Sequence, residues 1–184
     1  MALLTIAKLG HPLLRQRALR VEPEEIATLA FQALLEDMIE TMRKENGAGL
    51  AAPQIFVSKR LVVVEVGRNP RYPEAPPIPL TILVNPELAP LDPEMEEGWE
   101  GCLSVDNLRG RVARFTRLGV RSLDRRGREQ NFEAAGFFAR ALQHECDHLD
   151  GTLFVDRVRD TRTLTHLKEW ERYHLPNGGG QAGD

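Results

Sequence analysis

The chain has 184 residues, with 24 Lys or Arg against 27 Asp or Glu, which gives a formal net charge of −3. This length predicts a single domain with a full hydrophobic core, and hydrophobic residues make up 42% of the sequence. The balanced charge argues against nucleic-acid binding through bulk electrostatics, and the apolar runs are too short for a membrane span. Two cysteines make no disulfide framework, and the N-terminus lacks the features of a signal peptide. We therefore expect a soluble intracellular protein.

The first predicted element is a helix over residues 23–44. Pro23 suits the first turn, and the acidic residues that follow it suit the positive end of the helix dipole. Asn46-Gly47 is a plausible stop. Apolar residues at helical spacing predict one buried stripe, made of Ile26, Leu29, Ala30, Ala33, Leu34, Met38 and Met42.

A region rich in strands follows this helix. Residues 61–66 and 81–84 are β-branched runs of strand length. The prolines of residues 69–79 exclude regular structure there, so we expect an extended surface loop between the two strands. Residues 117–123 and 130–134 are typical of a hairpin, with its turn at Arg125-Arg126-Gly127.

Two helices are predicted after the hairpin, over residues 136–149 and 163–173. The order of helix, strands and helices indicates an α+β fold. We expect antiparallel strands packed around the helix at 136–149, with one helix near the N-terminus and one near the C-terminus. Residues 1–175 form the expected single domain, and the glycine-rich residues 176–184 form an expected disordered tail.

The predicted helix 136–149 contains the motif HExxH, as His144-Glu145-Cys146-Asp147-His148. At about 100° per residue, His144 and His148 project from one face, one turn apart. Two imidazoles at this spacing can chelate one divalent ion, and the adjacent Glu145 can act on a water molecule bound to it. The two histidines align with Phe137 and so face the interior, while Cys146 points the opposite way. The alternative is a pair of core histidines bonded to backbone carbonyls.

The motif leaves the third metal ligand open. Gly151 occupies the glycine position of HExxHxxG, but the third histidine of that pattern would fall at Phe154, which cannot bind a metal. Glu169 or Glu171 could complete a site of the thermolysin type, although neighbouring charges favour a solvated helix face. Cys102 is another candidate, because one Cys and two His leave a tetrahedral position open, as a catalytic site requires.

A glycine-rich segment, GAGLAAPQ, spans residues 47–54 and superficially matches a dinucleotide-binding fingerprint. That fingerprint needs a strand before it and a helix after it, whereas here a long helix precedes it and Pro53 follows. The segment instead indicates a close approach of the backbone to another group, with Gln54 as a buried amide donor. A simple turn that ends the preceding helix is the alternative.

Three motifs occur in order along the chain: GAGLAAPQ, EGCLS at residues 100–104 and HECDH at residues 144–148. Together they resemble the peptide deformylase family, and the resemblance extends from His11 to the last helix. It implies a hydrolase that removes the formyl group from the N-terminal methionine of new polypeptides and releases formate. It also implies one divalent metal ion, ferrous iron, which zinc, nickel or cobalt can replace.

The resemblance also implies roles for individual residues. The metal ligands would be Cys102, His144 and His148, and Glu145 would be the catalytic acid and base. The side-chain amide of Gln54 and the backbone N–H of Leu103 would stabilise the oxyanion. The expected substrate-binding residues are Gly47, Ala48, Gly49 and Phe137.

The sequence departs from the family pattern at Asp106-Asn107, where Pro-Gly is common, and this departure concerns the shape of the loop and its fit to substrate rather than the chemistry. The expected partners are N-formyl-methionyl peptides, with a transient ribosome contact and no nucleic acid or membrane. We expect a bacterial cytoplasmic location, with a trimmed organellar form left open. The competing hypotheses are a zinc peptidase that uses Glu169 and a non-catalytic relative that binds peptides.

Overall fold

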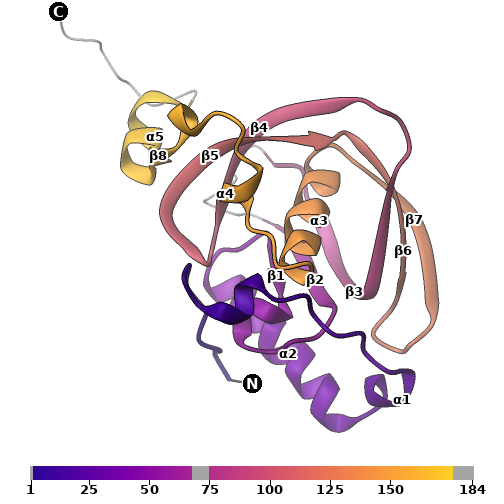
Figure 1. Ribbon diagram of the computed structural model, residues 1–184. Coiled ribbons are helices and arrows are strands. Elements are labelled where there is room, and N and C mark those ends of the chain that lie inside the picture. The colour runs from indigo at the N-terminus through magenta and orange to yellow at the C-terminus, as the bar shows by residue number, and fades with distance from the viewer. Residues whose placement is uncertain (1, 68–74, 176–184) are drawn as a thin grey trace, which may run out of the picture.

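Figure 1 shows a computed structural model of the chain, in which the structure describes residues 2–67 and 75–175. The predicted tail at 176–184 and residues 69–74 of the predicted loop lie outside the described residues. The helices are α1 (Pro23–Ile26), α2 (Leu29–Lys44), α3 (Gly136–Leu149), α4 (Phe154–Arg157) and α5 (Leu167–Tyr173). The strands are β1 (Gly49–Ala51), β2 (Leu61–Val66), β3 (Ile78–Pro90), β4 (Met95–Cys102), β5 (Val105–Phe115), β6 (Arg117–Leu123), β7 (Glu129–Ala135) and β8 (Thr165–His166).

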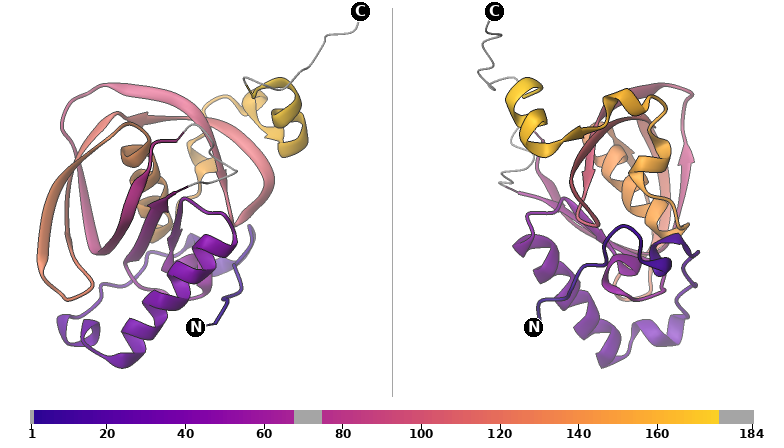
Figure 2. Two further views of the ribbon diagram at one scale, coloured as in Figure 1. Left: turned by 180° about the vertical axis from the view of Figure 1, so that it is seen from behind. Right: turned by 60° about the vertical axis from the view of Figure 1, so that its left-hand side comes forward.

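The strands form two antiparallel sheets, which confirms the predicted α+β fold. One sheet has the order β1-β2-β3-β6-β7, and the other has the order β4-β5-β8. Helix α3 lies in the middle of the molecule with strands around it, and α2 lies outside the larger sheet (Figure 1, Figure 2). Helix α5 lies at the edge of the molecule, away from the β6–β7 hairpin.

Strand β2, which lies between β1 and β3, is apolar along nearly its whole length because both of its faces are covered. Val62 and Val64 belong to the cluster that packs against α3, whereas Leu61 and Val63 belong to the cluster that packs against α2. Successive side chains of a strand point to opposite faces, so one short run of apolar residues fills two cores. The larger sheet thereby holds α3 at a fixed distance from α2.

The helix predicted over residues 23–44 is wrong as a single element. It is divided into α1 and α2 at Ala27 and Thr28, and the Thr28 Oγ1 accepts a hydrogen bond of 3.2 Å from the Phe31 N–H. This N-cap starts a new helix with a new phase. Leu29 is therefore 90% exposed, and Ala33 is also exposed. Ala30, also predicted in the buried stripe, is exposed. Met38 and Met42 are buried as predicted, and Phe31, Leu35 and Ile39 complete the buried stripe of α2.

Other predicted elements differ from the structure mainly in length. The helix over 136–149 is confirmed, and the predicted hairpin agrees with β6 and β7 to within one residue at each strand end. Strand β3 begins at Ile78, so the last residues of the predicted proline-rich loop are strand. The predicted helix 163–173 is shorter, because Thr165–His166 form β8 beside β5 and α5 begins at Leu167.

The structure makes a specific prediction about Gly151, which follows the end of α3. Its φ is +73°, and a Cβ there would lie 2.7 Å from the backbone carbonyl of Arg15. We expect Gly151→Ala to lower the free energy of unfolding by about 2–4 kcal/mol, measured by urea denaturation. Gly127→Ala is the matched control, since φ there is +76° but the nearest atom to a Cβ is 3.7 Å away. An equal loss in both variants would show that the Arg15 contact contributes nothing.

Candidate metal centre and its pocket

Three potential metal ligands meet where α3 passes the end of β4. The ligand atoms of Cys102, His144 and His148 all lie within 4.8 Å of one another. The Cys102 Sγ is 3.3 Å from the Nε2 of His148, and both side chains are buried. Glu169 and Glu171 are exposed on α5 and are not part of this group. Of the three candidates for the third ligand, the structure brings only Cys102 to the two histidines.

The surroundings of Cys102 favour a thiolate. Burial alone would raise the pKa of the thiol, but the charge of His148 and hydrogen bonds from both histidines hold it well below its ordinary value. The Gln54 amide and the Ser104 N–H also donate to the sulfur, at 3.5 and 3.4 Å. Thiolate is the form of cysteine that binds metals. By contrast, burial raises the pKa of Cys146, which packs in the hydrophobic core on the other side of α3.

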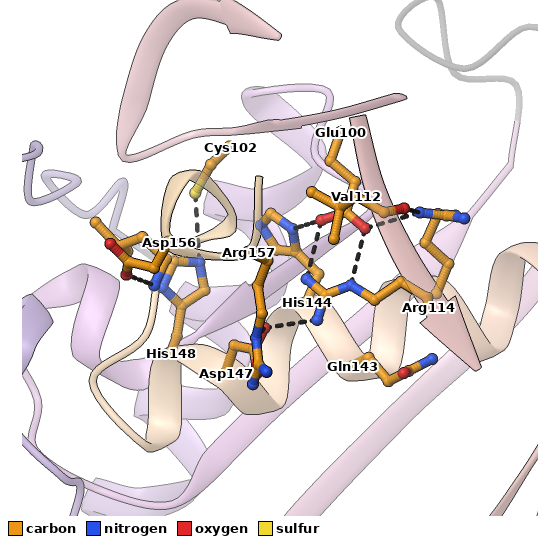
Figure 3. A network of polar contacts seen from close by, with 12 residues as sticks. Glu100, Cys102, Val112, Arg114, Gln143, His144, Asp147, His148, Asp156 and Arg157 are labelled. Carbon is orange, nitrogen blue, oxygen red and sulfur yellow. Dashed lines mark hydrogen bonds and ion pairs between the residues drawn. The ribbon is translucent and has the colours of Figure 1, made fainter. Parts of the chain in front are cut away.

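Glu100 orients His144. Its Oε2 is 2.9 Å from the Nδ1 of His144, so the other ring nitrogen of this histidine is available to a metal (Figure 3). A carboxylate behind a histidine fixes the ring and its tautomer in many metal sites. Glu100 and Cys102 are two residues apart at the end of β4, where the register against β5 shifts, and both side chains are buried beside α3. This spacing is the signal in the sequence that could have revealed the role of Glu100, which the motif analysis missed.

A chain of ion pairs, buried except at the half-exposed Arg157, extends from Glu100 (Figure 3). The guanidinium of Arg114 donates to both oxygens of Glu100, at 2.9 and 3.0 Å, and to Asp147 at 2.6 Å. Arg140 adds a bond of 3.0 Å to Glu100, and Arg157 adds one of 2.6 Å to Asp147. Burial opposes the charge on Glu100, but the bonds from His144 and Arg114 lower the pKa of its carboxyl strongly. The network ties β4 and β5 to both ends of α3.

Glu145 points toward the segment Gly49–Ala51. A Cβ at Gly49 would lie 2.6 Å from the Cγ and Oε1 of Glu145, so only glycine leaves room for this carboxylate. The predicted close approach of the glycine-rich segment to another group is confirmed, and Glu145 is that group. Burial raises the pKa of Glu145, and its Oε2 has no hydrogen-bond partner among the described residues.

Gln54 is buried beside the cysteine. Its Oε1 accepts a hydrogen bond of 2.8 Å from the Ala51 N–H, and its amide nitrogen donates to the Ser104 Oγ at 3.2 Å. The amide is therefore held in one orientation next to Cys102. The contribution of Ser104 was not anticipated, because a serine two residues after a cysteine is unremarkable in a sequence.

A pocket opens beside this cluster. The expected substrate-binding residues, Gly47, Ala48, Gly49 and Phe137, all line it, as do Gln54, Cys102, Leu103, His144 and Glu145. Trp99 also lines the pocket, and its ring contacts that of Trp170 on α5, with 6.4 Å between centroids. Buried thiolate and imidazole donors, a buried carboxylate and an adjoining pocket with apolar walls define a metal-dependent hydrolase.

Comparisons with known proteins agree with this class. The family model described as Polypeptide deformylase matches residues 3–163. Peptide deformylase 1 of Nitrosomonas europaea is 49% identical over 157 residues, which cover 85% of this chain and 88% of that protein. The class I type b peptide deformylase of Acinetobacter baumannii, solved with Met-Ala-Ser bound, has a TM-score of 0.83 and 41% identity over 85% of this chain and 99% of that one. The peptide deformylase from Thermotoga maritima has a TM-score of 0.77 and 36% identity, and the match covers 87% of this chain and 100% of that one.

The chain therefore belongs to the polypeptide deformylase family, and the resemblance inferred from its motifs is confirmed. It is an enzyme that removes the N-terminal formyl group from nascent polypeptides, a reaction that depends on a catalytic metal. None of the described helices is long and apolar enough to span a membrane.

The contact between Gly49 and Glu145 yields a prediction. Gly49→Ala should displace the carboxylate and lower kcat by about 100-fold, because a shift of ~1 Å in a reacting group costs that much. Metal content should stay unchanged, since the three atoms nearest to the new methyl group all belong to Glu145 and not to a candidate ligand. Gly67→Ala is the control, because a Cβ at Gly67 has nothing within 4 Å. The measurement is the rate of formate release by Gly49→Ala and by Gly67→Ala. Equal rates would refute the close packing of Gly49 against Glu145.

Proposed function

We propose that this protein hydrolyses the formamide of N-formyl-methionyl peptides with the residues that surround its pocket. The observation that carries the proposal is the meeting of Cys102, His144 and His148 beside Glu145 and Gln54, from segments far apart in the sequence. A short 3-10 helix (Ala52–Ile55), the end of β4 and helix α3 supply these groups.

Cys102, His144 and His148 fit a divalent cation. One thiolate and two imidazoles suit iron, zinc, nickel and cobalt alike. A metal-binding histidine typically has a carboxylate as hydrogen-bond partner, as His144 has in Glu100. We propose ferrous iron, as the family resemblance implies, with the other three ions as substitutes. When bound, such a cation supplies an activated water and polarises the formyl oxygen.

Glu145 is the proposed acid and base. Its carboxylate takes a proton from the attacking water as the new C–O bond forms at the formyl carbon. It then delivers this proton to the leaving amine as the C–N bond breaks, which releases formate and a free N-terminus. The unpartnered Oε2 of Glu145 supports this role, because a proton carrier needs an oxygen that is free to bind substrate.

Gln54 and Leu103 are the proposed donors to the oxyanion. As the formyl carbon becomes tetrahedral, negative charge develops on its oxygen. The Gln54 amide and the Leu103 N–H would hold that charge in the pocket both residues line. The bond from the Ala51 N–H to its Oε1 fixes the plane of the Gln54 amide, and the N–H that reaches the Cys102 sulfur at 3.5 Å is the one that would turn to the oxyanion.

The pocket is proposed to receive a methionine-like side chain. Its walls are largely apolar, with Phe137, Ala141 and Leu103 among them. The Acinetobacter relative binds Met-Ala-Ser, whose first residue is the methionine that deformylation would leave exposed. We propose the same preference for this chain, with Gly47, Ala48, Gly49 and Phe137 of the pocket wall as the residues that bind the substrate.

We propose that the protein is located in the bacterial cytoplasm and contacts the ribosome transiently. The substrates are nascent chains, and the similar proteins come from bacteria. Helix α5 offers an edge for such a contact, since none of its side chains is buried.

The first test measures formate release from a formyl-Met-Ala-Ser peptide by protein purified without oxygen and loaded with Fe(II) or Ni(II). Rapid release by the wild type and a loss of about 100- to 10,000-fold in Glu145→Gln, at equal metal content, would support the proposed role. Glu169→Gln is the control and should match the wild type, because this carboxylate is exposed on α5. Full turnover in Glu145→Gln would exclude this residue as acid and base.

A second test addresses the ligands. Cys102→Ser should lose tight metal binding, measured by elemental analysis after dialysis against a weak chelator, because a serine hydroxyl is a far poorer ligand than a thiolate. Cys146→Ser should retain the ion, since this cysteine lies outside the ligand group. Retention of the ion by Cys102→Ser would return Glu169 to consideration.

A further inference from the structure

Three consecutive residues near the N-terminus, Ala7, Lys8 and Leu9, bridge the two segments that carry the proposed oxyanion donors. We call these residues the N-terminal strap. The Ala7 N–H donates to the Gln54 carbonyl at 2.7 Å, and the Leu9 N–H donates to the Ser104 carbonyl at 2.7 Å. The strap runs beside the end of the β4–β5 hairpin in Figure 1.

Lys8 makes the most specific contacts of the strap. Its Nζ donates to the carbonyl of Leu103 at 2.9 Å and to the carboxylate of Asp106 at 2.8 Å. Lys8 and Asp106 are about half exposed, so their ion pair alone contributes little to stability. The ion pair instead fixes the position of the Lys8 ammonium group beside the carbonyl oxygen of Leu103.

That carbonyl belongs to the central peptide of a tight turn. Cys102 pairs with Val105, so Leu103 and Ser104 are the two residues at the tip between β4 and β5. The central peptide of such a turn is the part that rotates when one turn type converts to another. Here Lys8 holds its carbonyl, and the Cys102 sulfur accepts its N–H at 3.4 Å from the Ser104 nitrogen. Rotation of this peptide would break both bonds.

We propose that Lys8 is a positioning residue that locks the Leu103–Ser104 peptide, anchors Leu103 through its carbonyl and thereby keeps the N–H of the same residue within reach of the substrate oxygen. This inference rests on the proposed function of Leu103 and Gln54. The backbone bonds of Ala7 and Leu9 keep the Gln54 and Ser104 segments at a fixed spacing. Lys8 then sets the orientation of the turn itself.

The proposal also accounts for the unusual pair Asp106-Asn107. Asp106 supplies the second acceptor that holds the Lys8 ammonium in place, and Asn107 adopts φ +54°, which asparagine tolerates better than most residues. The loop therefore keeps its shape through an ion pair with the strap.

The test compares Lys8→Met with Lys8→Arg and with the control Lys59→Met. Lys59 is also ion-paired, to Glu25 at 2.6 Å, but it lies away from the pocket. In metal-loaded enzyme we expect Lys8→Met to lower kcat about tenfold at unchanged KM and metal content, because a misaimed oxyanion donor loses part of the ~100- to 1,000-fold that such a donor provides. Lys8→Arg keeps a cation with several donors and should stay within about threefold of the wild type.

Hydrogen exchange provides a readout that does not depend on turnover. The Ser104 amide should exchange at least about tenfold faster in Lys8→Met, because the lock on its peptide is lost, while the amides of β6 and β7 stay unchanged. Faster exchange together with a lower kcat supports the proposal.

Three outcomes would overturn it. Unchanged exchange would show that Lys8 does not hold the peptide. Faster exchange at full kcat would show that the lock has no bearing on the reaction. A rise in KM alone that disappears at high salt would show that Lys8 attracts substrate by its charge. A wild type without formate release would instead refute the proposed function, while the exchange measurement would still decide whether Lys8 holds the turn.

Discussion

The buried carboxylate of Glu100 is the constraint on which the rest of the site depends. It accepts hydrogen bonds from Arg114 on β5 and from Arg140 and His144 on α3. A buried charge is tolerated only when its partners are all in place, and loss of one partner typically costs about 3–5 kcal/mol. The hairpin and the helix therefore cannot slide past each other, and the ion pairs hold Cys102 close to the two histidines.

Hydrophobic packing and ion pairs both hold α3 in place, and each restricts a different motion of the helix. The larger sheet covers one side of the helix with apolar side chains, an arrangement that fixes its depth but tolerates some rotation about its axis. Directional hydrogen bonds that arginines donate to Glu100 and Asp147 remove that rotation. The chemically active face of the helix is thus oriented by groups that take no part in the proposed reaction.

The sequence was most informative where chemistry requires a fixed local spacing. HExxH, EGCLS and the glycine-rich segment identified the family and the residues that meet at the pocket, because each motif is short and its residues act together. The register of α2 could not be predicted, since the cap at Thr28 resets the helical phase and no periodicity reveals it. Strand β4, with the sequence MEEGWEGC, lacks β-branched residues and owes its conformation to pairing with β5. Arg114, Arg140 and Asp147 were missed because they find Glu100 and one another only after folding.

The contact between Trp99 and Trp170 has a practical consequence. The chain has only two tryptophans, and their rings lie 6.4 Å apart, one against the pocket and the other on α5. Excited indole rings this close exchange energy efficiently, so the two side chains emit as a coupled pair. The intrinsic fluorescence of this enzyme therefore senses both a peptide arriving in the pocket and a departure of the last helix, and replacing Trp170 with Phe would separate the two signals without any attached dye.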